Sequence, residues 1–181
     1  MKRFATWLVV AGAVVVLGTA NYTIWQRQQI VDHGRPVLLE LRPVDPRSLI
    51  QGDYMALAYA ETIFPAADER SQLPRRGSFI VTLDADSVAT FARLDTGGSL
   101  AANEARIKYK LVDQRGGMRL GAESYFFQEG QADLFADAEF GVLHVDDAGN
   151  SVLIGLAGEN KLIIQAPENE TGPDGARQDR D

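Results

Sequence analysis

Two acidic residues are the strongest candidates for chemistry in this chain of 181 residues. Asp53 follows Gly52 in the stretch DPRSLIQGDYMALAY, and Glu129 precedes Gly130 in ESYFFQEG. Two carboxylates roughly 5–10 Å apart across a cleft can serve as general acid and base in a hydrolase. Either acid also has a structural role open to it, because Asp can hold a turn and Glu is favoured at the start of a helix. A small envelope hydrolase using Asp53 and Glu129 is therefore the alternative function.

Nucleophilic catalysis finds little support. The chain has no Cys, which excludes a thiolate nucleophile. The segment SLIQGDY resembles the Leu-x-x-Gly-Asp pattern of type I signal peptidases, but in that register Val44 stands where the nucleophilic Ser would be. Ser48 lies at the wrong offset. Lys108 and Lys110 alternate onto the solvent side of a predicted strand, where a Lys keeps its proton and cannot act as the base.

Metal and cofactor binding is not indicated either. The two His residues, His33 and His144, are far apart in the sequence. Asp133 and Asp137 form an i,i+4 pair, which we interpret as a solvated acidic face of a helix. No glycine-rich loop has the Lys of a phosphate site. We therefore expect no cofactor.

The charge balance excludes a nucleic-acid partner. The net charge is -7, and without Lys2 and Arg3 the remainder has 16 basic against 25 acidic residues, or about -9. A nucleic-acid-binding protein needs a basic face.

The N-terminus predicts a membrane anchor. After Lys2 and Arg3 no charged residue occurs over residues 4–26, a run of 23 residues. Such a helix is roughly 34 Å long, enough for the bilayer core of ~30 Å. The aromatic residues Trp7, Tyr22 and Trp25 stand near its ends, as at membrane interfaces. We predict a cytoplasmic tip at residues 1–3, an anchor at 4–26 in the inner membrane, and the rest in the periplasm.

A cleaved signal peptide is the other interpretation of the same segment, with cleavage after Ala20. Beyond the anchor, residues 27–35 are predicted to continue the helix as a stalk. Gly34 can cap this helix and Pro36 would stop it.

Residues 36–166 predict a mainly β, extracytoplasmic domain: a small antiparallel sheet or partly open barrel with one short helix. Apolar alternation and turn residues indicate strands, expected at 37–43, 53–60, 77–84, 105–113 and 123–128. The segment 87–95 fits a strand or a short helix, and 131–140 fits a helix. A hairpin with its loop at 146–150 and a last strand at 161–165 follow, and 167–181 is predicted to be a disordered tail.

The stretch before and within 53–60 has a structural explanation. Asp45 and Pro46 favour a turn, and Gly52 gives the backbone freedom before the strand. The strand alternation puts Met55, Leu57 and Tyr59 on one face, which we expect to be the inner one. Tyr54 lies on the other face with Ala56, Ala58 and Ala60, and we expect its ring to pack against a neighbouring strand.

The octapeptide GDYMALAY resembles the signature of the GDYXXLXY family at all five fixed positions: Gly52, Asp53, Tyr54, Leu57 and Tyr59. The later segment ESYFFQEG, with Glu123, Tyr125, Glu129 and Gly130, is similar to the family's second block. The resemblance implies a bacterial membrane-anchored protein with an extracytoplasmic domain. It also implies a multi-span membrane protein as partner. The family has no established activity.

The leading prediction is therefore a binding or accessory domain without catalytic activity. It contacts lipid through its N-terminal helix and acts with an integral membrane partner. Its candidate binding residues are those of the two motif blocks together with Asp45 and Pro46.

Overall fold

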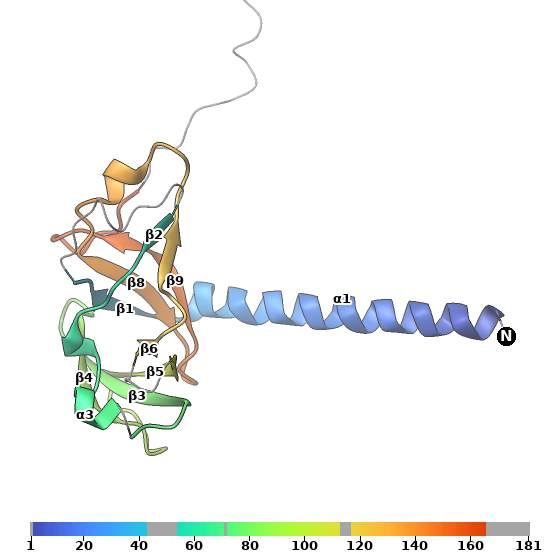
Figure 1. Cartoon of the computed structure of the whole chain (residues 1–181), viewed down its shortest axis with the longest axis horizontal. Coiled ribbons are helices and arrows are strands. Elements are labelled where there is room, and N and C mark those ends of the chain that lie inside the picture. The colour runs from blue at the N-terminus through green and yellow to red at the C-terminus, as the bar shows by residue number, and fades with distance from the viewer. Residues whose placement is uncertain (1, 43–53, 71, 113–116, 166–181) are drawn as a thin grey trace, which may run out of the picture.

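A single long helix leads into a β domain. The computed structural model describes residues 2–42, 54–70, 72–112 and 117–165, without the side chains of residues 2–6, 8 and 9. Helix α1, Lys2–His33, projects away from the domain for most of its length (Figure 1). The predicted anchor and stalk are thus one continuous helix. Among the residues described, no helix combines the length and apolar character needed to cross a membrane.

The last turns of α1 pack against the domain. Ile30 is buried, and the Nδ1 atom of His144 lies 2.7 Å from the carbonyl oxygen of Val31. The helix ends at His33. Gly34 makes the last i→i−4 bond, from its N–H to the carbonyl of Ile30 (2.9 Å), and the chain then enters β1 at Arg35. The predicted cap at Gly34 is confirmed.

Within the ranges that the structure describes, the strands form three antiparallel sheets. The first has the order β1-β8-β9 and contains Arg35–Glu40, Phe140–Val145 and Ser151–Ala157. The second pairs β2, Tyr54–Ala56, with β7, Ser124–Phe126. The third has the order β4-β3-β5-β6 and contains Ala89–Leu94, Arg76–Leu83, Glu104–Leu111 and Met118–Arg119.

Isolated bridges join these sheets. Leu38 pairs with Val88 between the first and third sheets, and Leu41 pairs with Tyr59 next to the second. The sheets do not close into a barrel within the described part of the chain. The mainly β prediction is confirmed, with several small sheets rather than one. The short helices in the described ranges are η1 at Glu61–Ile63, α3 at Ala67–Arg70 and η2 at Ala132–Phe135.

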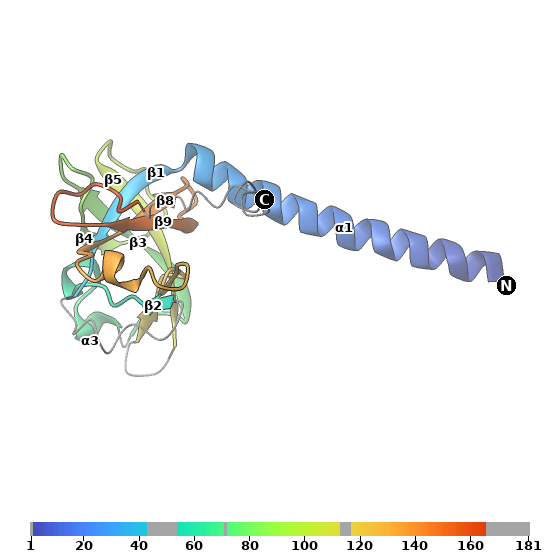
Figure 2. The same ribbon diagram turned by 90° about the horizontal axis from the view of Figure 1, so that it is seen from above.

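A large apolar core fills the space between the sheets, and a smaller buried cluster formed by Leu38, Phe140, Val142 and Ala157 lies apart from it. Alternate residues of β1, β3, β5 and β8 contribute side chains that are wholly inaccessible to solvent, among them Leu39, Phe79, Ile107 and Leu143. The ring of Phe79 contacts those of Phe64, Phe91 and Tyr109 at centroid distances of 6.0–6.4 Å. Figure 2 shows these sheets stacked at one end of the molecule, with α1 leaving beside β1 and β8.

The helix predicted over 131–140 is wrong in length. Only the turn η2 forms, and β8 already begins at Phe140. The backbone of Glu139 is used by neighbouring segments: its N–H bonds to Ala157 and its carbonyl accepts from Leu41. Sheet pairing therefore ends the helix that local propensity favours.

Two further predictions were settled by local backbone geometry. The segment 87–95 contains a strand, β4, which follows a turn in which the Asp84 carboxylate accepts two backbone N–H groups. The strand predicted at 161–165 is wrong. Lys161 has a positive φ of 60° and closes a turn onto Gly158, and the segment then makes only an isolated bridge from Ile163 to Ala157.

Candidate functional site

The two motif blocks pair with each other. Strand β2 from the octapeptide lies antiparallel to β7 from ESYFFQEG, with Tyr54 opposite Phe126 and Met55 opposite Tyr125. Leu57 extends the pairing by donating its N–H to the carbonyl of Glu123 (2.8 Å). We call β2 and β7 the motif ribbon. Segments some seventy residues apart in the sequence therefore form one unit.

The inner face of the motif ribbon belongs to the core. Met55, Leu57 and Tyr59 are all buried, as the alternation of the sequence predicted. On β7 the ring of Tyr125 meets the buried ring of Phe135 edge to face at 5.0 Å. Burial of alternate residues fixes the register, because a slip of one residue would turn this set outward.

Tyr59 is a buried hydrogen-bond donor. Its hydroxyl donates to the carbonyl oxygen of Ala122, just before β7. Burial raises the pKa of Tyr59 well above its ordinary value, and the negative charge of Glu123 adds to the increase. The phenol therefore stays protonated at physiological pH and holds the motif strand to the second block.

Glu123 closes the turn before β7. Its carboxylate accepts hydrogen bonds from the backbone N–H groups of Leu120 and Gly121, the latter at 2.9 Å. Gly121 has a φ of +85°, a conformation that favours glycine. The Glu123 carboxylate therefore holds the turn whose Ala122 and Glu123 carbonyls accept the two hydrogen bonds from Tyr59 and Leu57.

The outer face carries an aromatic pair. The rings of Tyr54 and Phe126 lie 5.7 Å apart, and Phe126 is 73% exposed. Ala56 and Ala58 continue the same face of the strand with small side chains. The expected packing of Tyr54 on a neighbouring strand is confirmed, and that strand is β7.

A groove of about 620 Å³ runs along this face, which we call the motif groove. Tyr54, Ala56 and Ser124 line it from the ribbon, and Arg42, Arg70 and Arg119 line it from the surrounding segments. Arg70 pairs with Glu61 at 2.5 Å and lies over the ring of Phe64 at 5.7 Å. Three cations against Glu61 and Glu123 give these lining residues a net charge of about +1 within an acidic chain.

The remaining predicted site residues do not meet here. Asp45, Pro46, Gly52 and Asp53 lie outside the described residues, so the pairing of Asp53 with Glu129 is untested. Glu129 is exposed in the turn before η2, and η2 has no side-chain hydrogen bond at its N-cap, so Glu129 does not anchor its start. Gly130 supplies the positive φ of 82° that this turn uses.

No cluster of three or more His, Asp or Glu side chains suited to a metal ion occurs in the described ranges. His144 nevertheless lies against the end of α1. Its Nδ1 atom is 2.7 Å from the carbonyl oxygen of Val31, two residues before His33, although the two His residues are far apart in the sequence. No pattern in the sequence indicated the cationic groove, because Arg42, Arg70 and Arg119 come from three separate segments.

The comparisons with known proteins identify a family. A family model described as GDYXXLXY protein matches residues 16–156, which is more than half of the chain. Searches of curated proteins and of solved structures find no match. The chain therefore belongs to the GDYXXLXY family, as the motif resemblance indicated.

Proposed function

From its membership of the GDYXXLXY family and the geometry of the motif ribbon, we propose that the protein is a membrane-anchored accessory protein. Residues 4–26 of α1 are the anchor, Lys2 and Arg3 remain in the cytoplasm, and the β domain lies in the periplasm of a bacterial cell. The domain binds an integral membrane partner through the motif groove. It does so without catalysing a reaction.

The exposed surface of α1 supports the anchor. Val14, Val15, Val16 and Leu17 are each 62–66% exposed. Four successive residues turn through most of a helix's circumference, so this segment has no polar side facing water. A helix that is apolar all round needs an apolar surrounding. The uncharged run begins at Phe4, and the side chains of residues 4–6, 8 and 9 are not among those described.

One observation carries the binding role: the signature strand buries one face and presents the other. Leu57 and Tyr59 are buried in the core, whereas Tyr54 lies on the outer face beside Phe126, which is strongly exposed. Exposed aromatic side chains beside a polar rim are typical of recognition surfaces. Tyr54 and Phe126 are therefore the anchoring contacts of the proposed surface.

The charges of the motif groove indicate the kind of segment that it takes. Arg42 and Arg119 are exposed at its sides, and Ala56 and Ala58 leave room above the strand. An extended segment that carries a carboxylate and an apolar side chain fits these features, because guanidinium groups bind carboxylates in a planar, bidentate way. The partner then contributes such a segment from a periplasmic loop.

Site-specific photo-crosslinking in intact membranes tests this function. A photoreactive phenylalanine analogue at Phe126 is expected to form one dominant cross-link to an integral membrane protein. Phe126 does not itself line the motif groove, but its ring lies 5.7 Å from that of Tyr54, which does. The same analogue at Leu162, which is 68% exposed and does not line the groove, is the matched control. The charge change Arg119→Glu is expected to reduce the Phe126 cross-link about ten-fold, as loss of a charge-assisted hydrogen bond would.

Equal cross-linking from both positions, or no effect of Arg119→Glu, would contradict binding at the motif groove. Recovery of the full-length chain in the soluble fraction of the cell, or a mature chain that begins at Asn21, would contradict the anchor. The two parts of the proposal therefore fail by different measurements.

The hydrolase that uses Asp53 and Glu129 stays the alternative. Its test is direct: the purified chain is assayed against ester and peptide substrates beside the variant Asp53→Asn/Glu129→Gln. An activity that this variant loses, with its unfolding curve unchanged, would favour the hydrolase over the accessory protein.

A further inference from the structure

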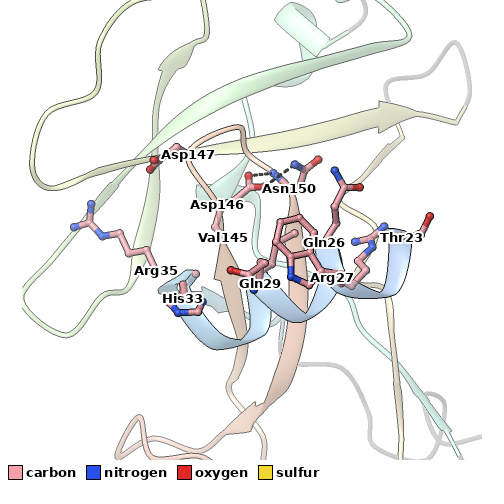
Figure 3. A pocket seen from close by; sticks show the side chains of 13 residues that line it. Thr23, Gln26, Arg27, Gln29, His33, Arg35, Val145, Asp146, Asp147 and Asn150 are labelled. Carbon is pink, nitrogen blue, oxygen red and sulfur yellow. Dashed lines mark hydrogen bonds between the residues drawn. The ribbon is translucent and has the colours of Figure 1, made fainter. Parts of the chain in front are cut away.

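A second groove lies where α1 meets the domain. It is bounded on one side by the last turns of α1 and on the other by the β8–β9 hairpin, and its volume is about 680 Å³ (Figure 3). Thr23, Trp25 and Arg27 line it from the helix, and Asp146, Asp147 and Asn150 line it from the hairpin loop. We call this the helix-exit groove.

Both walls of the helix-exit groove are firmly held. The helix side is fixed by the burial of Ile30 and by the contact between Val31 and His144. The loop side is fixed by Asp146, whose two carboxylate oxygens accept from the backbone and side chain of Asn150, each at 2.7 Å (Figure 3). A groove with such walls is preformed, so a ligand would not have to order them.

The groove carries charges of both signs. Arg27 approaches the carbonyl of Ser151 at 3.4 Å, a contact that uses one of the five donors of its guanidinium group. Asp147 is exposed at the loop, where Arg106 holds its backbone carbonyl at 2.7 Å. Arg35 also lines the groove and donates to the carbonyl of Glu104 at 3.1 Å. The lining therefore holds two cations and two carboxylates, and the carboxylate of Asp146 is already bonded to Asn150.

The level of the groove follows from the proposed anchor. If the span ends near residue 26, Thr23 and Trp25 lie at the lipid interface and Arg27 lies just beyond it. From Gln26 to His33 the helix rises about 10 Å, which overlaps the headgroup layer of roughly 5–8 Å on each side of the bilayer core. The groove thus opens at the depth of the phospholipid headgroups.

We propose that the helix-exit groove binds the headgroup of a zwitterionic aminophospholipid, with the phosphate against Arg27 and the ammonium against Asp147. This inference rests on the proposed anchor. A headgroup that carries both a phosphate and an ammonium offers a partner to Arg27 and to Asp147, whereas an anionic headgroup without an ammonium offers none to Asp147. Trp25 packs at the interface beside the bound lipid.

Native mass spectrometry of the full chain in detergent tests this binding with two probes, phosphatidylethanolamine and phosphatidylglycerol. The wild-type chain is expected to retain phosphatidylethanolamine about ten-fold better. Arg27→Gln is expected to lower retention of both lipids about ten-fold, and Asp147→Asn to remove the preference between them. Arg75→Gln and Asp137→Asn, exposed residues that do not line the groove, are the matched controls.

Equal retention of the two lipids by the wild-type chain would overturn the proposal. Lipid retention by Arg27→Gln at the wild-type level would also overturn it. Retention lost equally in the two control variants would also overturn it, because it would reflect nonspecific charge. A chain that stays in the membrane but shows no lipid preference contradicts only this inference. A chain found in the soluble fraction contradicts the proposed anchor first.

Discussion

The hydroxyl of Tyr59 donates a hydrogen bond to the backbone carbonyl of Ala122, and this bond joins the two motif blocks of the chain. Tyr59 is the last fixed residue of the octapeptide, and Ala122 lies one residue before the second block. Because Tyr59 is buried, the bond is shielded from competing water. The last Tyr of the signature thus has a structural role in the core, whereas Tyr54 is half-buried and contacts the exposed Phe126 on the outer face.

The change Tyr59→Phe is expected to lower the free energy of unfolding by about 1–2 kcal/mol. The ring still fills its site, but the Ala122 carbonyl loses its donor and stays buried without a partner. Urea unfolding of the detergent-solubilised chain measures the loss. Tyr22→Phe is the control, because its hydroxyl lies on the exposed part of α1. Equal stability of the two variants would show that the hydrogen bond contributes nothing.

Alkaline pH is expected to destabilise the domain through the same residue. The folded-state pKa of Tyr59 is raised above its ordinary value of 10.0, so the native state keeps a proton that the unfolded chain releases. Stability from this group is complete below pH 10 and falls above it by up to about 1.4 kcal/mol per pH unit. Unfolding measured from pH 9 to 11 should therefore decline less steeply in Tyr59→Phe than in the wild type.

Phe135→Ala is expected to lower the free energy of unfolding by about 3–5 kcal/mol, which is among the largest losses for a single substitution. Phe135 is 2% exposed and lies between the rings of Tyr125, at 5.0 Å, and Phe127, at 5.5 Å. Its removal leaves a cavity behind the motif ribbon. Leu134→Ala is the matched control, since Leu134 adjoins it in η2 but is 42% exposed. Similar losses in both variants would contradict this packing.

The same residue explains what the sequence could and could not predict. Periodicity predicted the inward set Met55, Leu57 and Tyr59, because alternation in a strand is a local property. It also suggested a helix over 131–140, yet Phe135 turns into the ring cluster and the backbone of Glu139 joins the sheet. Contacts between segments distant in the chain decide that outcome, and no local pattern contains them.

The pairing of β2 with β7 and the clustering of arginines in the motif groove could not be predicted from the sequence, for the same reason. Each motif block was recognised as a strand, but nothing in either one specified the other as its partner. The register of β2 and β7 depends on which faces are buried, and that depends on the whole core. The arginines of the motif groove likewise meet only after folding.

Asp95 is expected to make stability depend on acid pH. Ser78 and Arg106 both donate to its Oδ2 atom at 2.6 Å, and the N–H of Gly97 donates to Oδ1 at 3.0 Å. The hydrogen bond from Ser78, followed by those from Arg106 and Gly97, lowers the pKa of Asp95 to about 2 from 3.8. Its stabilisation is therefore present above pH 4 and is lost as the pH falls through 2.

The size of this effect is about 1–2 kcal/mol, allowing for solvent screening. Asp95→Asn should remove that part of the acid dependence between pH 4 and 2, as measured by urea unfolding at each pH. Asp137→Asn, at an exposed position, should leave the wild-type profile unchanged. An Asp95→Asn profile that matches the wild type would mean that other carboxylates cause the acid dependence.

Gly34→Ala is expected to disturb the junction between α1 and the domain. A Cβ atom at this position would overlap the carbonyl oxygen of Ile30 and come within 2.9 Å of the His144 Cβ atom and 3.1 Å of the Val145 backbone nitrogen. Two of these three neighbours are backbone atoms, which cannot move aside cheaply. The change should cost about 1–3 kcal/mol of domain stability.

It should also loosen the last turns of α1 against β8, because Val31 and His144 meet at the same place. Trypsin cleavage after Arg27 should therefore become faster in Gly34→Ala. Gly98→Ala is the control, since a Cβ atom there meets nothing within 4 Å and the φ of Gly98 is not positive. If both variants resist trypsin as the wild type does, the close contact of Gly34 with β8 is not what holds the end of α1 against the domain.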